Sequence, residues 1–115
     1  MALIDNLDIG NFVKLVGFQD NPYRYYANCD LFILSSRWEG YPNVLIENYY
    51  FNTPIVATRC VPIVQQMINE GENGYLCDVN DAECLAEKTL KCILLKRENI
   101  RNQYMGSQLE ELFDE

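Results

Sequence analysis

Two glutamates separated by seven residues, Glu39 and Glu47, are the side chains in this chain best placed to do chemistry. They lie between two apolar segments with the composition of buried strands, residues 31–34 and 54–57. Between them the chain turns at Gly40 and resumes as a predicted helix, whose first N–H groups would favour a phosphate. Because carboxylates repel phosphate, we expect both glutamates to accept hydrogen bonds from hydroxyl groups on either side of it, as a nucleotide sugar would offer.

Three motifs around this pair occur in a specific order. The glutamates lie in a Ser-x-x-Glu-Gly-aromatic-Pro context, which is followed by Pro-Ile-Val-Ala-Thr at residues 54–58 and by Gly-Glu-Asn-Gly at residues 71–74. In this order the motifs resemble the donor-binding half of retaining glycosyltransferases of family 4, which have the GT-B fold. The resemblance extends from about Gly17 to Asp78. It is far more specific than a lone pair of glutamates.

The resemblance implies an activity and a role for each site residue. A sugar would pass, with retention and without a metal or other cofactor, from a UDP- or GDP-sugar to a cell-surface polysaccharide or a lipid-linked glycan. Glu39 would lie against the transferred sugar as the catalytic residue, and Glu47 would bind the ribose hydroxyls. The backbone N–H groups of Gly40 and Tyr41 would bind the distal phosphate, with glycine allowing close approach.

Three neighbouring residues complete the predicted donor-binding set, each with a structural alternative. Arg37 would either reach a phosphate or form a salt bridge. Pro42 is expected to shape the turn, and Asn43 to cap the helix that follows, more than to touch the ligand. One stretch departs from the family, since residues 59–66 lack the usual glycines and the following glutamate. That difference leaves the sugar specificity and the level of activity open.

Composition excludes several other classes. A net charge of −8 argues against nucleic acid as a partner. Five cysteines without a Cys-x-x-Cys motif, in a chain without histidine, are expected to be reduced structural thiols rather than disulfides or zinc ligands. No apolar stretch is long enough to span a bilayer, so we expect a cytoplasmic location, with peripheral attachment to the inner face of the plasma membrane left open for a full-length protein.

Alternating strand and helix patterns predict a Rossmann-like α/β layer with a parallel sheet. Strands are expected at residues 12–16, 31–34, 55–57 and 75–77. Helices are expected from Pro22 and over residues 44–51, 62–70 and 81–96, and a helical tail over residues 99–115. In the helix at 81–96 the predicted inward positions are Ala82, Leu85, Ala86, Thr89 and Ile93.

Residues 1–115 are expected to form a single, partial domain. A GT-B donor domain begins with two further βα units, and an acceptor-binding domain precedes them; neither is seen before Met1. We therefore expect activity only together with the missing parts, and self-association through unpaired strand edges. Two alternatives stay open: a non-catalytic remnant or interaction module with weak nucleotide binding, and an unrelated Rossmann-like nucleotide binder. The lack of Gly-x-Gly-x-x-Gly counts against a dinucleotide.

Overall fold

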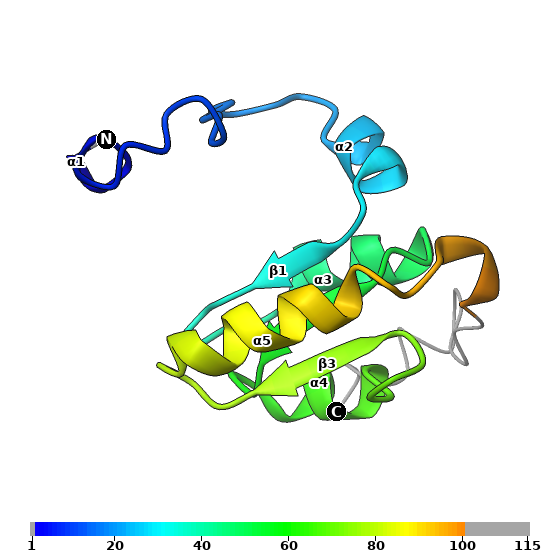
Figure 1. Cartoon of the computed structure of the whole chain (residues 1–115). Coiled ribbons are helices and arrows are strands. Elements are labelled where there is room, and N and C mark those ends of the chain that lie inside the picture. The colour runs from blue at the N-terminus through cyan, green and yellow to red at the C-terminus, as the bar shows by residue number, and fades with distance from the viewer. Residues whose placement is uncertain (1, 101–115) are drawn as a thin grey trace.

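The computed structural model describes residues 2–100 and shows an α/β fold built around one parallel sheet (Figure 1). The strands of the described residues are β1 (Phe32–Leu34), β2 (Ile55–Thr58) and β3 (Gly74–Cys77). The helices of the same residues are α1 (Ala2–Asn6), α2 (Tyr23–Asn28), α3 (Asn43–Tyr50), α4 (Pro62–Met67), α5 (Ala82–Cys92) and the 3-10 helix η1 (Arg97–Asn99). The alternation from β1 to α5 confirms the predicted Rossmann-like architecture.

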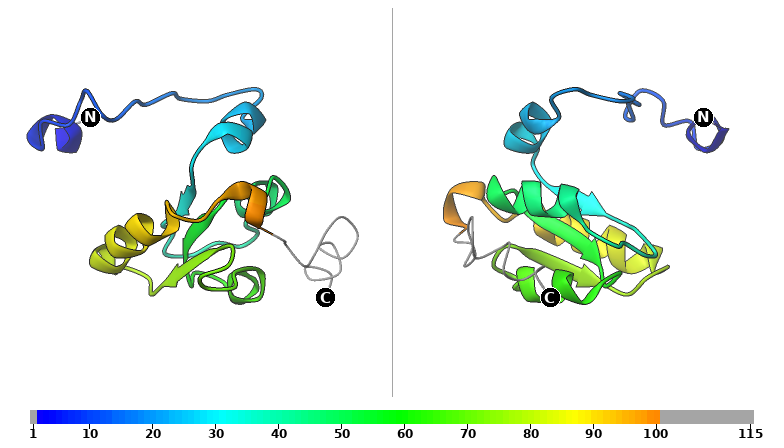
Figure 2. Two further views of the ribbon diagram at one scale, coloured as in Figure 1. Left: turned by 45° about the vertical axis from the view of Figure 1, so that its right-hand side comes forward. Right: turned by 180° about the vertical axis from the view of Figure 1, so that it is seen from behind.

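The described strands lie in the order β1-β2-β3, and neighbouring strands are parallel. Ile55 of β2 pairs with Phe32 of β1 and with Gly74 of β3, so the three strands begin at the same edge of the sheet. Helix α5 covers one face of the sheet, and α3 and α4 cover the other (Figure 2). All four residues of β2 are buried, as expected for a strand with neighbours on both sides and helices on both faces.

The hydrophobic core lies between the sheet and the pair α3 and α4. Helix α3 buries Leu45 and Tyr49, which are four residues apart and therefore project from the same face. They pack with Ile55 of the sheet and with Val64 and Met67 of α4, which are fully buried. This packing holds α3 firmly against β2, which matters because α3 carries one of the two glutamates.

The strand predicted at residues 12–16 is wrong. The structure has irregular backbone there, and the segment lies apart from the sheet, between α2 and α1, a helix that the sequence did not predict (Figures 1 and 2). The N–H groups of Phe12 and Val13 both donate to the carbonyl oxygen of Ile9, at 2.9 and 3.1 Å. The start of the segment is thus bent into a turn. No described strand pairs with it, so its alternating apolar pattern has no ladder to join.

Two finer predictions also need correction. Asn43 is the first residue of α3 and not its cap; Pro42 occupies the cap position, without a side-chain hydrogen bond. In α5 the buried stripe is rotated relative to the expected one. Three of the predicted inward residues, Ala82, Ala86 and Ile93, are exposed, whereas Cys92 is fully buried.

The C-terminal tail predicted over residues 99–115 falls outside the described residues from residue 101 onward. Before residue 101, helix α5 ends at Cys92 and the chain continues into η1. Across the described residues, every helix is too short or too polar to cross a lipid bilayer.

Candidate functional site

The loops that follow the three strands leave the sheet at one edge, because parallel strands all end on the same side. The loop after β1 carries the predicted residues from Arg37 to Pro42 and leads into Asn43, the first residue of α3. Its beginning is held by Thr58, the last residue of β2, whose buried hydroxyl donates to the carbonyl oxygen of Ser36 at 2.6 Å and lies 3.5 Å from that of Leu34. The central strand therefore fixes the point from which the site loop departs.

At the turn, Gly40 lies beneath the exposed side chain of Trp38. A Cβ atom at this position would lie 3.3 Å from the indole ring of Trp38, closer than such atoms ordinarily pack. Pro42 is buried, and the N–H group of Asn43 donates to the carbonyl oxygen of Tyr41 at 2.9 Å as α3 begins. The N–H groups of a first helical turn have no acceptor inside the helix. The turn thus places the start of α3 at the carboxyl edge of the sheet.

The charged residues of this loop have no partner among the described residues. Arg37 is exposed and Glu39 half-buried, and neither forms an ion pair with any residue from 2 to 100. Of the two alternatives for Arg37, the salt bridge is therefore not seen in the described part of the chain.

Glu47 lies one helical turn into α3 and faces a different part of the surface. It lines a hollow of about 250 Å³ together with four apolar or aromatic residues: Tyr23, Ile46, Tyr50 and Phe51. Burial and, secondarily, the nearby charges of Glu47 and Tyr23 raise the pKa of Tyr26 above its usual value. Glu47 therefore lies on the side of α3 that faces α2. Glu39 does not line this hollow.

The aromatic residues around Glu47 were not predicted to contribute to a site. The sequence shows them as two tyrosine groups separated by more than twenty residues, and only the packing of α2 on α3 brings them together. Tyr23 lies against Phe51 with ring centroids 5.9 Å apart. Residue spacing alone carried no signal for this contact.

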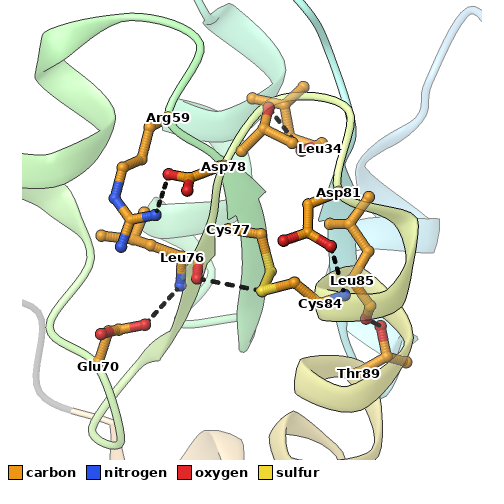
Figure 3. Close-up of a disulfide and its surroundings, with 11 residues drawn as sticks. Leu34, Arg59, Glu70, Leu76, Cys77, Asp78, Asp81, Cys84, Leu85 and Thr89 are labelled. Atoms are coloured by element: carbon orange, nitrogen blue, oxygen red, sulfur yellow. Dashed lines mark hydrogen bonds and ion pairs between the residues drawn. A yellow bond between two sulfur atoms is a disulfide. The ribbon is translucent and has the colours of Figure 1, made fainter.

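The loop after β3 forms the other side of the carboxyl edge and contains the disulfide (Figure 3). Cys77 ends β3 and is bonded to Cys84 in the first turn of α5. The expectation of five reduced thiols is therefore wrong for this pair. Helix α5 folds back over the sheet and brings the two Cα atoms to 5.9 Å, within the range for a disulfide, although the cysteines are seven positions apart in sequence. Their spacing gave no sign of this.

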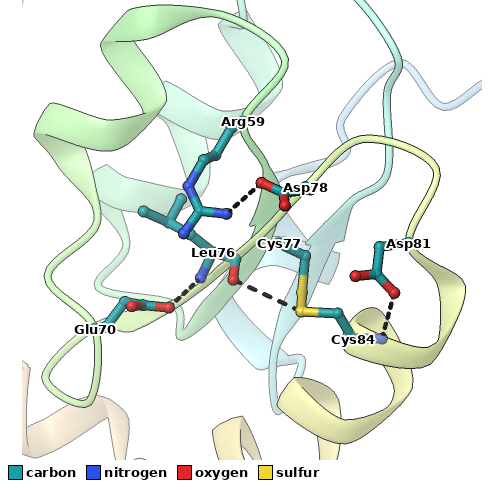
Figure 4. Close-up of polar contacts among 7 residues, drawn as sticks. All are labelled: Arg59, Glu70, Leu76, Cys77, Asp78, Asp81 and Cys84. Atoms are coloured by element: carbon teal, nitrogen blue, oxygen red, sulfur yellow. Dashed lines mark hydrogen bonds and ion pairs between the residues drawn. A yellow bond between two sulfur atoms is a disulfide. The ribbon is translucent and has the colours of Figure 1, made fainter.

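An ion pair connects this loop to the loop after β2 (Figure 4). The guanidinium of Arg59 lies 2.9 Å from the carboxylate of Asp78, with 35% and 79% of the two side chains exposed. Such an exposed pair contributes little to stability. Arg59 is the first residue of the stretch, residues 59–66, that departs from the family. This stretch therefore places a paired cation at the carboxyl edge of the sheet. Asp81 caps α5 by accepting from the N–H group of Cys84 at 3.1 Å.

A larger hollow lies elsewhere in the described part of the chain. It has a volume of about 550 Å³ and is lined by the turn before β3 and the segment after α5, at the amino edge of the sheet. None of the predicted site residues lines it. Among the described residues, no three His, Cys, Asp or Glu side chains come together as a metal site.

Comparison with known proteins gives the family. The sequence pattern of the family described as glycosyl transferases group 1 matches residues 1–108. The chain belongs to this family. The three parallel strands with helices on both faces agree with the Rossmann-like domain of a GT-B protein, so the predicted fold class is confirmed.

Several curated relatives of this chain are named glycosyltransferases, and one is named a synthase. It is 32% identical over 106 residues to the N-acetylgalactosamine-N,N'-diacetylbacillosaminyl-diphospho-undecaprenol 4-alpha-N-acetylgalactosaminyltransferase of Campylobacter jejuni, covering 90% of this chain and 28% of that protein. It is 34% identical over 111 residues to the N-acetyl-alpha-D-glucosaminyl L-malate synthase of Bacillus anthracis, covering 96% and 28%. It is 36% identical over 84 residues to a lipopolysaccharide core biosynthesis glycosyltransferase of Rhizobium meliloti, covering 73% and 24%. The chain thus spans about a quarter of the length of these relatives.

Proposed function

We propose that this chain is the donor-binding part of a family 4 retaining glycosyltransferase, which transfers a sugar from a UDP- or GDP-sugar to a glycan or lipid-linked acceptor. The observation that carries the proposal is the loop from Arg37 to Pro42, held between β1 and the start of α3 at the carboxyl edge of the sheet. Nucleotide ligands bind at this edge in open α/β sheets. Relatives named for undecaprenol-linked and lipopolysaccharide glycans support this acceptor class.

The donor would bind along α3, from its first turn to Glu47. The diphosphate would lie at the first turn, where N–H groups and the helix dipole favour negative charge. Glu47, one turn further on, would accept hydrogen bonds from the ribose hydroxyls, beside the aromatic hollow. Glu39 precedes the helix and would face the sugar on the other side of the phosphates. The chain would act within a longer protein that supplies the acceptor site and a basic contact to the diphosphate.

Catalysis at such a site would depend on stabilising charge that develops in the transition state. As the bond between the sugar and the diphosphate breaks, negative charge grows on the leaving phosphate, and preorganised N–H groups stabilise it. Glu39 would orient the sugar and stabilise the oxocarbenium-like anomeric carbon. The pair does not fit a glycosidase, because Glu47 lies in a helix facing α2 and is assigned to the ribose.

The second candidate is a non-catalytic module that retains weak nucleotide binding. It is favoured by one observation, the loop after β2, where Arg59 is paired with Asp78 and residues 59–66 offer neither glycine nor carboxylate. In that case the chain would bind the nucleoside diphosphate and show no preference for its sugar-bearing form.

Substitution of each glutamate separates these candidates. Glu47→Ala should weaken binding of UDP or GDP to this chain roughly tenfold, the effect of losing a hydrogen bond to a charged group. Glu39→Ala should leave that affinity unchanged and instead lower kcat in an active protein containing the chain. Titration by NMR measures the first effect, and sugar-transfer assays measure the second. Glu72→Ala, an exposed change at the amino edge, is the control. Equal and negligible effects of both substitutions would rule out the catalytic proposal.

A further inference from the structure

Arg97, at the start of η1, donates four hydrogen bonds to groups that are 44 to 71 residues away in sequence. One terminal nitrogen donates to the carbonyl oxygen of Phe51 at 2.7 Å and to the hydroxyl of Thr53 at 2.8 Å. The other donates to the carbonyl oxygens of Tyr26 and Cys29, at 2.9 and 2.8 Å. A single half-buried side chain thus joins two separate parts of the chain.

Those acceptors lie at the C-terminal ends of two helices. Tyr26 and Cys29 belong to the end of α2, and Phe51 directly follows α3. The last carbonyl groups of a helix lack partners inside it and carry the negative end of the helix dipole. A guanidinium offers several N–H groups in a rigid planar arrangement, so it can serve both helix ends at once. A lysine ammonium cannot reproduce this geometry.

The hydrogen bonds of Arg97 connect to further contacts on the side of α3 on which Glu47 lies. The hydroxyl of Thr53, which accepts from Arg97, donates to the carbonyl oxygen of Tyr26 at 2.9 Å. The side chain of Tyr26 is close enough to Glu47 for that charge to contribute to its raised pKa. The hollow beside Glu47 is lined by Tyr23 from α2 and by residues at the end of α3. Its two walls are therefore the two helices that Arg97 joins.

We infer that Arg97 is a positioning residue, which locks α2 against the end of α3 and thereby holds the Glu47 carboxylate where ribose hydroxyls would meet it. This inference rests on the proposed function, because it assigns Arg97 a role in the nucleotide affinity of the same site. Arg97 itself lies at the end of α3 opposite to the loop that carries Glu39, and it would not touch the donor.

The role of Arg97 can be measured by comparing ligands that differ only in the ribose hydroxyls. UDP and GDP are titrated by NMR against their 2′,3′-dideoxy forms, with the native chain and with Arg97→Lys. The native chain should prefer the hydroxylated form roughly tenfold, the effect of a charge-assisted hydrogen bond. Arg97→Lys should bring this ratio close to one. A simple loss of folded protein lowers the affinity for both ligands equally and leaves the ratio unchanged.

Two further variants complete the test. Arg24→Lys alters an exposed arginine of α2, which contacts the neighbouring Tyr25, and should keep the native ratio. Thr53→Val removes one acceptor of Arg97 and the bond to Tyr26 at nearly constant volume, so it should lower the ratio about threefold. It also decides the question if Arg97→Lys does not fold.

The outcomes separate the two proposals. A native ratio of one, or no binding by any of the four ligands, would contradict the assignment of Glu47 to the ribose and with it the proposed function. A native ratio near ten that persists in Arg97→Lys, or in Thr53→Val where the lysine variant is unfolded, would overturn the role of Arg97 alone.

Discussion

Two buried threonines flank the central strand and connect it to opposite edges of the sheet. Thr53 precedes β2 and bonds to the backbone of α2, whereas Thr58 ends β2 and bonds to the loop that carries Glu39. A buried hydroxyl is stable only when it is hydrogen-bonded, so each threonine constrains the backbone it reaches. Neither residue is expected to touch a ligand, yet together they position both halves of the candidate site.

The cysteines give the first prediction at this scale. Three cysteines are free in the described structure, Cys29, Cys60 and Cys92, and two are joined as Cys77–Cys84. Thiol titration of the unfolded chain should therefore count three thiols without reductant and five after reduction. Cys84→Ser should raise the count without reductant to four, because it releases Cys77. Finding five thiols in the non-reduced protein would contradict the disulfide.

Cys92 should make stability depend on alkaline pH. Burial raises the pKa of this fully buried thiol from 9.0 to about 11. The folded state therefore keeps the proton longer than the unfolded state does, so the stabilisation is complete below pH 9 and is lost as the pH rises through 11. Between about pH 8 and about pH 10.5 the free energy of unfolding should fall by roughly 2 kcal/mol more than in Cys92→Ala. Urea unfolding of both proteins measures the difference, and equal pH dependence would contradict it.

At the scale of elements, the turn before β3 gives a structural reason for two of the three specified residues of the Gly-x-Asn-Gly motif, Asn73 and Gly74. Asn73 is buried, accepts from the N–H group of Asn69 at 2.8 Å and donates to the carbonyl oxygen of Met67 at 2.9 Å. Gly74 lies so close to β2 that a Cβ atom would overlap the carbonyl oxygen of Ile55. Asn73 therefore holds the turn, and Gly74 permits the close pairing of β2 and β3.

Gly74→Ala should accordingly be severely destabilising. The added methyl group would meet backbone, which cannot move without separating β2 from β3, so we expect a loss of at least about 3 kcal/mol. Gly10→Ala is the matched control, since nothing lies within 4 Å of that position, and it should change stability by less than about 0.5 kcal/mol. Urea unfolding measures both values. A Gly74→Ala protein as stable as the Gly10→Ala protein would show that the strands can separate at little cost.

The elements from β1 to α5 could be predicted because their signals are local. The apolar run at residues 31–34 predicts a strand, although the expected burial on both faces fails because Ile33 is exposed, and Pro62 marks a helix start. The strand prediction for residues 12–16 was wrong because an alternating apolar pattern forms a strand only beside a partner strand. The predicted buried stripe of α5 was wrong because the face that a helix buries is set by its packing on the sheet, where Cys84 is bonded to Cys77, and not by its own sequence pattern alone.

The candidate site also has one part that could be predicted from local sequence and one part that could not. Arg37 to Asn43 are contiguous, so their common location in one loop and the helix start after it follows from the sequence. The contacts of Arg97 join residues up to 71 positions apart, and no local pattern indicates them. Whether these residues bind a donor stays a prediction.

At the scale of the whole molecule, the described chain combines a packed α/β body with an extended N-terminal segment. The body has two edge strands, since β1 and β3 each pair only with β2 among the described strands. The segment exposes large apolar side chains, with 86% of Phe12, 61% of Leu15 and 90% of Phe18 accessible to solvent. Exposed apolar surface and an open strand edge both favour association with another chain.

We therefore expect the chain to self-associate in solution despite its charge of −8, with segment 12–16 of one copy pairing with the open edge of β1 in another. Light scattering coupled to size exclusion should show dimers or larger species at about 100 μM and a shift to monomer on dilution. Lys14→Pro, which removes a backbone N–H group from the segment, should weaken this association, and Asp20→Pro just beyond it should not. Amide exchange of residues 12–16 should slow as the concentration rises. A monomer at every concentration, with these amides exchanging freely, would show that the segment takes no part in assembly.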